Sequence, residues 1–185
     1  MPILAEETAL FPEDLLDAWE PGSSERTWWA IYTKARQEKS LARHLLRYQV
    51  PFYLPMVAKT LLKRGRRVRS HVPLFAGYVF LYGSVDERRL ALTTNRISQV
   101  LVVADPARLH RDLQQVRRLI ESGAPLTVES RLQPGQRVRI RAGALEGVEG
   151  EVISRSRKCR MVVAVDFLQK GVSMEIEDVM LEPLG

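Results

Sequence analysis

The densest run of charged side chains in the sequence is basic and lies between residues 59 and 71. Six lysines and arginines surround Gly65 in this stretch: Lys59, Lys63, Arg64, Arg66, Arg67 and Arg69. Cationic groups this close together repel one another unless anions lie near them, and nucleic-acid phosphates are suitable anions. The run therefore indicates a basic β-hairpin that binds DNA or RNA.

A second group of basic side chains falls on one side of a helix predicted over residues 34–49. Leu41, Leu45 and Tyr48 make its apolar side. The basic side carries Lys34, just before the helical turn, and then Arg36, Lys39, Arg43, His44 and Arg47. This cationic face is either a solvated helix surface or a contact for a nucleic acid, to which Arg96 would add.

Groups that could catalyse a reaction are not brought together by the sequence. The histidines and the cysteine lack the spacing of metal ligands or of a nucleophile with its base; they are His44, His71, His110 and Cys159. No glycine-rich loop ends in Lys-Ser or Lys-Thr, so a P-loop is absent as well. We expect a protein that is not an enzyme and that uses no metal and no cofactor.

The composition is that of a globular protein, with 45% hydrophobic and 27% charged residues in 185. No stretch approaches the roughly 20 apolar residues of a membrane span, and the sequence starts without a secretory signal. A single cysteine, Cys159, cannot form an internal disulfide. These features predict a cytoplasmic protein without a membrane partner.

Charge is distributed unevenly along the chain. Residues 1–25 hold seven acidic side chains and no lysine or arginine, which leaves 28 basic against 15 acidic residues in the remainder. Such a basic body favours polyanions. The apolar residues of this acidic leader, Phe11, Leu15, Leu16 and Trp19, have helical spacing. The leader is therefore either a short amphipathic helix that docks on a partner or on its own body, or a flexible tail.

The elements that must position these groups form two strand–helix–strand sets in residues 26–122. Strands are expected at 28–33, 52–58, 73–82 and 99–103, and helices at 34–49, 86–92 and 105–122. Sets of this kind that share one antiparallel sheet make an α+β sandwich, with helices on one face and the other face open to partners.

The last third of the chain has a different pattern. Residues 123–132 lack periodicity and are predicted to be a linker. From 133 to 185 the pattern is one of short strands and turns, with Gly143, Gly147 and Gly150 in one loop. This spacing predicts a small five-stranded all-β barrel.

Residues 138–152 (VRIRAGALEGVEGEV) resemble a KOW motif, which also occurs in ribosomal proteins. Residues 28–32 (WWAIY), the following helix, the basic hairpin and residues 73–80 (PLFAGYVF) resemble the amino-terminal domain of the NusG family. The resemblance covers residues 26–183, with Ala76 where the family usually has proline. It implies a transcription elongation factor with a KOW domain.

Within that family, residues 63–80 resemble the specialised RfaH-like paralogs more than housekeeping NusG, which remains an alternative. Tyr32, Lys34, His44 and Arg47 lie at matching positions, and residues 93–96 (TTNR) resemble a threonine-rich segment of those paralogs. The resemblance implies an antitermination function in which Lys34, His44, Arg47 and Arg96 contact non-template DNA. The family resemblance implies that aromatic side chains on the open sheet face bind the clamp helices of the largest RNA polymerase subunit. The candidates are Tyr32, Phe75, Tyr78 and Phe80.

In the KOW half, Phe167 lies where the family uses a phenylalanine to contact a small-subunit ribosomal protein or Rho, and Lys170 of the same loop is a second candidate contact although it differs from housekeeping NusG. Phe167 is otherwise a core residue of the barrel.

Two further interpretations of the chain remain open at this point: a ribosomal or structural RNA-binding KOW protein, and an adaptor that binds only proteins. A ribosomal protein would not require residues 26–122, and an adaptor would bind nucleic acid weakly at physiological salt.

Overall fold

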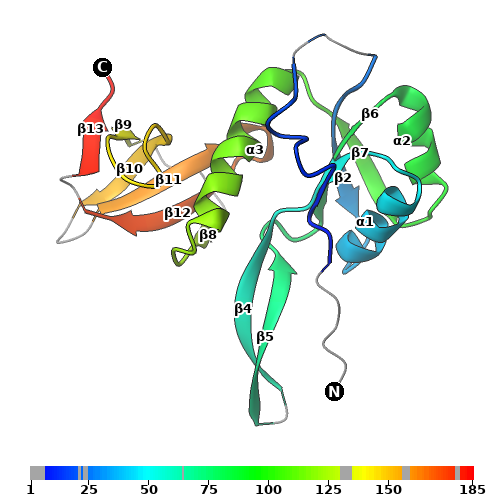
Figure 1. Ribbon diagram of the computed structural model, residues 1–185, viewed down its shortest axis with the longest axis horizontal. Coiled ribbons are helices and arrows are strands. Elements are labelled where there is room, and N and C mark those ends of the chain that lie inside the picture. The colour runs from blue at the N-terminus through cyan, green and yellow to red at the C-terminus, as the bar shows by residue number, and fades with distance from the viewer. Residues whose placement is uncertain are drawn as a thin grey trace. The chain divides into compact units, whose positions relative to one another are not determined.

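The computed structural model shows a mixed α and β chain that forms two compact units, Met1–Pro106 and Ala107–Gly185 (Figure 1). Each unit has its own antiparallel sheet, which confirms the predicted fold class. The structure describes residues 7–20, 22, 25–63, 65–129, 135–155, 159–177 and 180–185.

The first unit is built on a five-stranded antiparallel sheet with strand order β1-β3-β6-β2-β7. Strand β2 lies inside the sheet because its Trp, Ile and Tyr side chains favour a pleated surface with neighbours on both sides. The strands are β1 (Leu10–Phe11), β2 (Thr27–Thr33), β3 (Phe52–Tyr53), β6 (Tyr78–Gly83) and β7 (Ile97–Val102).

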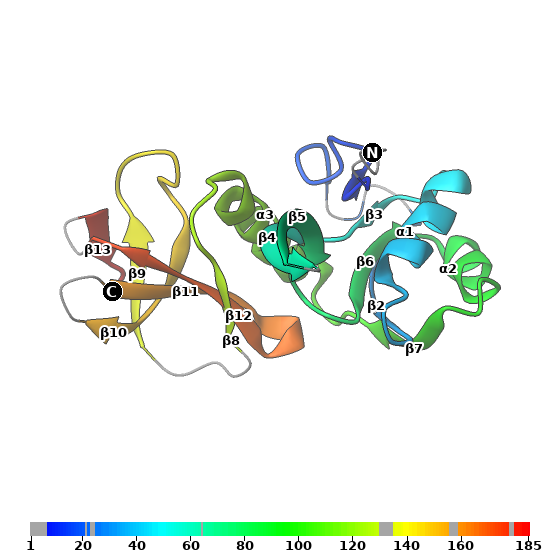
Figure 2. The ribbon, with the colours of Figure 1, turned by 90° about the horizontal axis from the view of Figure 1, so that it is seen from below.

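Two helices, α1 (Glu38–Arg47) and α2 (Val85–Leu92), cover one face of this sheet (Figure 2). Leu41 and Leu45 of α1 and Ala91 of α2 share one buried core with the strands. Helix α1 starts later than the sequence predicts because Arg36 has a left-handed φ of 58°. At the other end Gln49, with φ of 56°, terminates it.

The basic hairpin is confirmed as strands β4 (Met56–Lys63) and β5 (Arg66–Pro73), which pair along their whole length. It forms a separate two-stranded ribbon that projects from the first unit (Figure 1). Gly65, with φ of 74°, lies in the turn between the strands, a conformation that glycine adopts without steric cost. Arg64 lies outside the described residues.

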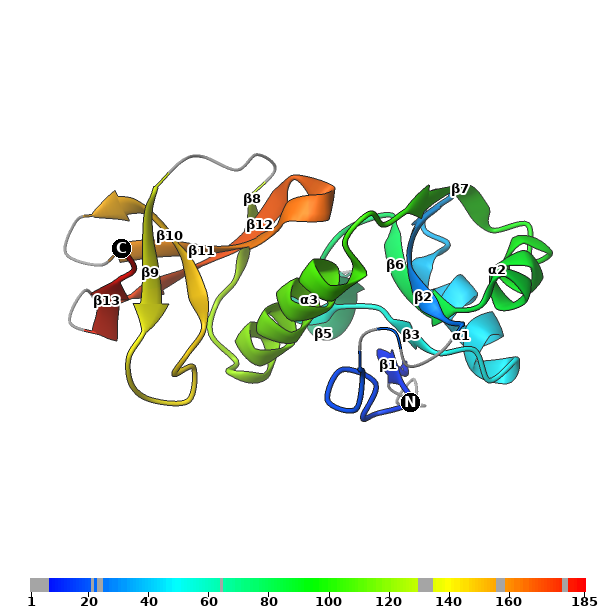
Figure 3. The same ribbon diagram turned by 90° about the horizontal axis from the view of Figure 1, so that it is seen from above.

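In residues 7–20 the acidic leader forms neither of the two structures that its sequence left open, a short amphipathic helix or a flexible tail. Its strand β1 pairs with β3 at the edge of the sheet (Figure 3), and a series of turns follows. Leu15 and Leu16 are buried, with exposures of 6% and 0%. Neither alternative was right, because open backbone groups at the sheet edge offered the leader a strand partner that its own sequence does not reveal.

The second unit combines helix α3 (Pro106–Glu121) with a six-stranded antiparallel sheet of order β13-β9-β10-β11-β12-β8. Five of its strands are the predicted ones. The sixth, β8, comes from the predicted linker and pairs with the edge strand β12. The strands are β8 (Thr127–Glu129), β9 (Gln136–Ile140), β10 (Glu149–Arg155), β11 (Cys159–Val165), β12 (Lys170–Ile176) and β13 (Leu181–Pro183).

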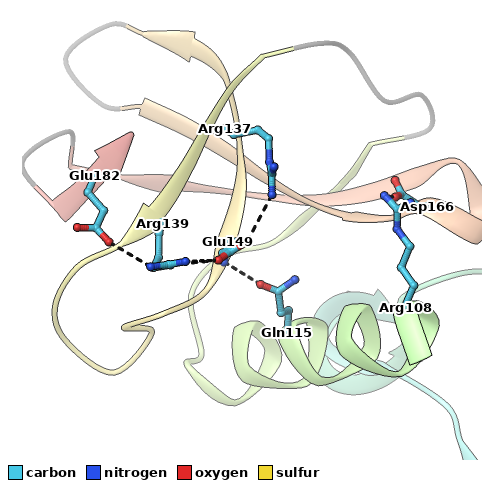
Figure 4. Close-up of polar contacts among 7 residues, drawn as sticks. All are labelled: Arg108, Gln115, Arg137, Arg139, Glu149, Asp166 and Glu182. Carbon is cyan, nitrogen blue, oxygen red and sulfur yellow. Dashed lines mark hydrogen bonds and ion pairs between the residues drawn. The ribbon is translucent and has the colours of Figure 1, made fainter. Parts of the chain in front are cut away.

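Polar contacts attach α3 to the sheet of the second unit (Figure 4). Gln115 accepts a hydrogen bond from the backbone N–H of Glu149 at 2.7 Å, and Arg108 forms an ion pair with Asp166. Arg118 donates to the carbonyl oxygen of Glu146 at 2.5 Å. The sequence predicts that the first domain ends at residue 122 and the linker at residue 132, and these boundaries stay a prediction. The contacts within the structure place α3 in the second unit instead of the first.

Among the residues that the structure describes, no helix is both long enough and apolar enough to cross a membrane.

Candidate functional site

Two tyrosines form a pair at one end of the sheet face opposite to α1 and α2. Tyr32 on β2 lies directly across from Tyr78 on β6, and their ring centroids are 5.2 Å apart at an interplanar angle of 50°. Tyr32 is 42% exposed and Tyr78 is half-buried. Burial, with a smaller contribution from Tyr32, raises the pKa of the Tyr78 hydroxyl, which therefore stays protonated. We call these two residues the tyrosine pair.

Gly77 makes the tyrosine pair possible. A Cβ atom at this position would lie only 2.7 Å from Cε2 of Tyr32, so any other residue would displace the ring. Gly77 also has a φ of 85°, which is strained for residues with a Cβ. The glycine of the sequence pattern PLFAGYVF is thus required by both the backbone conformation and the aromatic ring above it.

The two phenylalanines that were predicted to share this exposed patch, Phe75 and Phe80, are buried in the core instead. Phe75 and Phe80 have exposures of 1% and 0%, and their rings meet edge to face at 6.5 Å. Phe80 shares the sheet face of Tyr78, two residues along the strand, but it is enclosed there. In this structure the phenylalanines support the tyrosine pair from within the core, and only the tyrosines are accessible.

The basic residues near α1 come together from two distant segments. His44 and Arg47 lie in the last turn of α1, and Arg96 lies in the loop before β7. Desolvation lowers the pKa of His44, and the nearby charges of Arg96, Arg47 and Arg43 lower it further. Among the described residues, neither Nδ1 of His44 nor Nε of Arg96 has a hydrogen-bond partner, although both atoms are buried.

Hydrogen bonds fix the geometry of this region. The backbone N–H of Lys34 donates to the carbonyl oxygen of Arg96 at 2.9 Å, and Nζ of Lys34 reaches Oδ1 of Asn95 at 2.7 Å. Nη1 of Arg96 donates to Oε1 of Gln37 at 2.6 Å. We call the resulting patch the cationic surface; its residues are Lys34, His44, Arg47 and Arg96.

Tyr48 and Gln37 belong to this region although their positions in the sequence did not indicate it, and Arg43 lies there as expected for the cationic face. Tyr48 was expected on the apolar side of the helix but is 41% exposed, with its ring 6.3 Å from that of His44. The i, i+4 spacing of His44 and Tyr48 is the signal that could have revealed this neighbour. An exposed aromatic ring beside cations is a feature of single-stranded nucleic-acid sites, where bases stack.

The hairpin presents its arginines to solvent. Arg66, Arg67 and Arg69 are all exposed. Register places Arg67 opposite Leu62 and Arg69 opposite Thr60, so both arginines lie on one face of the ribbon, and Arg66 lies opposite Lys63 on the other. The ribbon therefore carries positive charge on both faces.

In the second unit, Phe167 lies in the short 3-10 helix η1 (Asp166–Leu168) and is half-exposed. Lys170 is half-exposed and begins β12, opposite Val165. Leu168, with an exposure of 9%, is the buried residue of this turn. Phe167 and Lys170 thus remain accessible near one end of the β11–β12 hairpin.

These surfaces define a binding module. The first unit offers an accessible aromatic pair, a cationic surface and a basic ribbon, and the described residues contain no group of three or more His, Cys, Asp or Glu side chains placed to hold a metal ion. The family model described as "Transcription termination factor nusG" matches residues 26–132, more than half of the chain. The chain belongs to the NusG family of non-enzymatic transcription factors.

Solved structures of related proteins were also compared with the chain. One is described as "Domain interaction in Thermotoga maritima NusG"; it has 15% sequence identity and a TM-score of 0.48, and the match covers 86% of this chain and 98% of that chain. Another is described as "Crystal Structure of MjSpt4:Spt5 complex conformation B"; it has 14% identity and a TM-score of 0.28, with 85% and 97% coverage.

Proposed function

We propose that this protein is a transcription elongation factor that binds RNA polymerase through the tyrosine pair and nucleic acid through the cationic surface. The observation that carries the proposal is the exposure of Tyr32 in a row of otherwise enclosed aromatic residues. Trp28 and Phe80 on the same face have exposures of 0%, so the accessible end of this row is confined to the tyrosine pair.

Such a pair suits a helical protein partner. Tyrosine combines a large apolar ring with a polar end, and one such anchor can contribute about 2 kcal/mol or more to binding when it fills a pocket. We assign as partner the clamp helices of the largest polymerase subunit. Phe75 and Phe80 contribute by holding β6 and its preceding turn in place.

The cationic surface is proposed to hold the exposed non-template DNA strand. Its support is the convergence of Arg96 with His44 and Arg47 at the end of α1. Phosphate oxygens would supply acceptors for the arginines, and Tyr48 a face for base stacking. The basic hairpin would extend this binding to upstream DNA or nascent RNA.

A specialised role in antitermination, rather than general elongation, is the finer part of the proposal. It is supported by Lys34, His44 and Arg47, which lie at positions that match RfaH-like paralogs, and by Arg96, which lies in the same patch. A ribosomal KOW protein is less favoured because the family match covers residues 26–132, a region that such a protein does not require.

Residues 133–185, which belong to the second unit, are proposed to be a KOW domain that contacts a small-subunit ribosomal protein or Rho. Phe167 and Lys170 are the candidate contacts because both are accessible at the end of one hairpin. A protein that binds a transcribing bacterial-type polymerase acts in the cytoplasm, and we propose that location for this chain.

Polymerase binding is tested with the full chain and an isolated clamp-helix fragment. Replacing Tyr32 and Tyr78 together by alanine is expected to weaken binding by at least tenfold, whereas Tyr48→Ala should have little effect. Tyr48 is a matched control because its exposure of 41% is close to the 42% of Tyr32. Equal binding by the folded double variant and the wild type would contradict the assignment.

Nucleic-acid binding is tested by the fluorescence anisotropy of labelled single-stranded DNA over a range of salt concentrations. Replacing both His44 and Arg47 by glutamine should weaken binding and reduce the salt dependence. Arg111→Gln, an exposed arginine on α3, removes one positive charge at another place and is expected to leave binding nearly unchanged. Equal losses for both variants would indicate that only net charge matters.

A further inference from the structure

The acidic leader is an integral part of the first unit. Strand β1 pairs with β3, and the backbone N–H of Leu54 donates to the carbonyl oxygen of Ala9 at 2.7 Å. Ala9 and Phe11 pack against the core between the sheet and its helices. Together with the burial of Leu16, these contacts hold the described start of the leader beside α1 and the sheet.

This position brings an acidic side chain to the basic side of α1. The guanidinium of Arg43 forms a two-oxygen contact with the carboxylate of Glu7: Nε lies 3.1 Å from both oxygens and Nη2 lies 2.9 Å from Oε1. The hydrogen bond that Arg43 donates to the Glu7 carboxylate raises the pKa of Arg43. A carboxylate in this geometry presents to arginine the same pair of acceptor oxygens that a phosphate presents.

Arg43 is a neighbour of the cationic surface. It lies one helical turn from Arg47, at the i, i+4 spacing that places both side chains on the same side of α1. Its charge also acts on His44, whose pKa it lowers. Without Glu7, Arg43 would therefore add a further cation to the patch that faces the nucleic acid.

We infer that Glu7 occupies Arg43 as an internal substitute for a phosphate group, and that the leader thereby limits the affinity of the cationic surface for nucleic acid. The inference rests on the proposed function. The Arg43 side chain is 61% exposed, and exposed ion pairs are weak, so a phosphate can displace the carboxylate. Because β1 stays paired, Glu7 remains close and can rebind Arg43 when the nucleic acid leaves.

Deleting the leader would not be a clean test, because the deletion also removes β1 and the buried side chains of Leu15 and Leu16. Single substitutions in the full chain avoid this difficulty. Glu7→Gln removes the competing charge, and Glu13→Gln is the matched control because Glu13 is an exposed acid of the same leader. Both variants change the net charge equally, so a difference between them reports position.

The measurement is the affinity for labelled single-stranded DNA as a function of salt. Glu7→Gln is expected to raise affinity about two- to fivefold, the size of one exposed ion pair, with a salt slope steeper by about 0.7 for one more phosphate contact. Arg43→Gln should cost little in the wild type but should abolish this gain in the Glu7→Gln background.

Equal gains from Glu7→Gln and Glu13→Gln would overturn the inference, since the leader would then act only through overall charge. Equal losses from Arg43→Gln in both backgrounds would overturn it too. The proposed function fails separately if replacing His44 and Arg47 does not weaken DNA binding by the wild-type chain. A loss in that variant without a specific effect of Glu7 would reject the leader mechanism alone.

Discussion

The carboxylate of Glu38 accepts a hydrogen bond from the backbone N–H of Gly77 at 2.7 Å. Glu38 begins α1 and is only 8% exposed, and Gly77 directly precedes Tyr78. The carbonyl oxygen of Gly77 in turn accepts a hydrogen bond from the N–H of Thr33 at 2.8 Å, next to Tyr32. Gly77 thus connects the helix of the cationic surface with both strands of the tyrosine pair.

Glu38→Ala should destabilise the protein by about 1–3 kcal/mol, because it leaves the N–H of Gly77 without its acceptor in a largely buried position. Glu38→Gln keeps an acceptor oxygen, so this variant should lose clearly less stability than Glu38→Ala. Urea unfolding of the two variants measures the difference. Equal losses would show that the charge of Glu38, rather than its role as an acceptor, stabilises this loop.

Gly77→Ala should weaken binding of the clamp-helix fragment because the new Cβ displaces the ring of Tyr32. Gly123→Ala is the matched control, since Gly123 also has a positive φ, of 70°, but no atom within 4 Å of the added Cβ. Both variants should lose about 1 kcal/mol of stability from backbone strain. Only the Gly77 variant should lose fragment binding, and equal binding by both would contradict the role of Gly77.

Phe80→Ala and Tyr32→Ala should distinguish a residue of the core, which affects folding stability, from a residue of the interface, which affects binding. Phe80 is fully buried, so its truncation is expected to cost about 3–5 kcal/mol of folding stability. Tyr32 is 42% exposed, so Tyr32→Ala should reduce folding stability much less than Phe80→Ala does. It should reduce the affinity of the folded protein for the clamp-helix fragment more. Thermal unfolding together with the binding assay tests the pair, and a large stability loss for Tyr32→Ala would place it in the core.

DNA binding should strengthen as the pH falls below about 6.5, the ordinary pKa of histidine. In the free protein, desolvation and the charges of Arg96, Arg47 and Arg43 lower the pKa of His44, so the imidazole is neutral at pH 7. A phosphate beside it would raise that pKa, so binding takes up a proton in this range. Anisotropy at pH 7.5, 6.5 and 5.5 measures the effect, which His44→Gln should remove.

A fragment that starts at residue 104 should melt at a higher temperature than one that starts at residue 123. The longer fragment retains α3, whose Gln115 and Arg118 contact the loop and strand at Glu146 and Glu149. Replacing Gln115 and Arg118 by alanine in the longer fragment should remove most of the difference. Equal melting temperatures of the two unsubstituted fragments would show that α3 does not stabilise the second unit.

The order of the elements followed from local patterns. Strand β2 is β-branched and aromatic, α1 has apolar residues at helical spacing, and the hairpin surrounds a glycine, so each could be predicted within a few residues. Helix ends were less accurate, because the left-handed residues Arg36 and Gln49 interrupt a pattern that looks continuous in the sequence. The basic residues of the hairpin were identified from charge, whereas those of the cationic surface were selected from charge together with the family resemblance.

Which aromatic residues reach the surface could not be decided in that way. Tyr78 and Phe80 share one face of β6, but only the surroundings of each determine its exposure. Arg96 joins His44 only because β7 pairs with β2 and brings its preceding loop beside α1. The contact of Glu7 with Arg43 likewise depends on the pairing of β1 with β3.

The sequence by itself determined the types of surface that this protein carries, because charge, glycine positions and apolar periodicity are local properties of the chain. The tertiary structure alone decided which residues share a surface: the tyrosine pair, the cationic surface and the leader's contact with Arg43. These groupings arise from strand register and burial, which depend on contacts between segments far apart in the sequence.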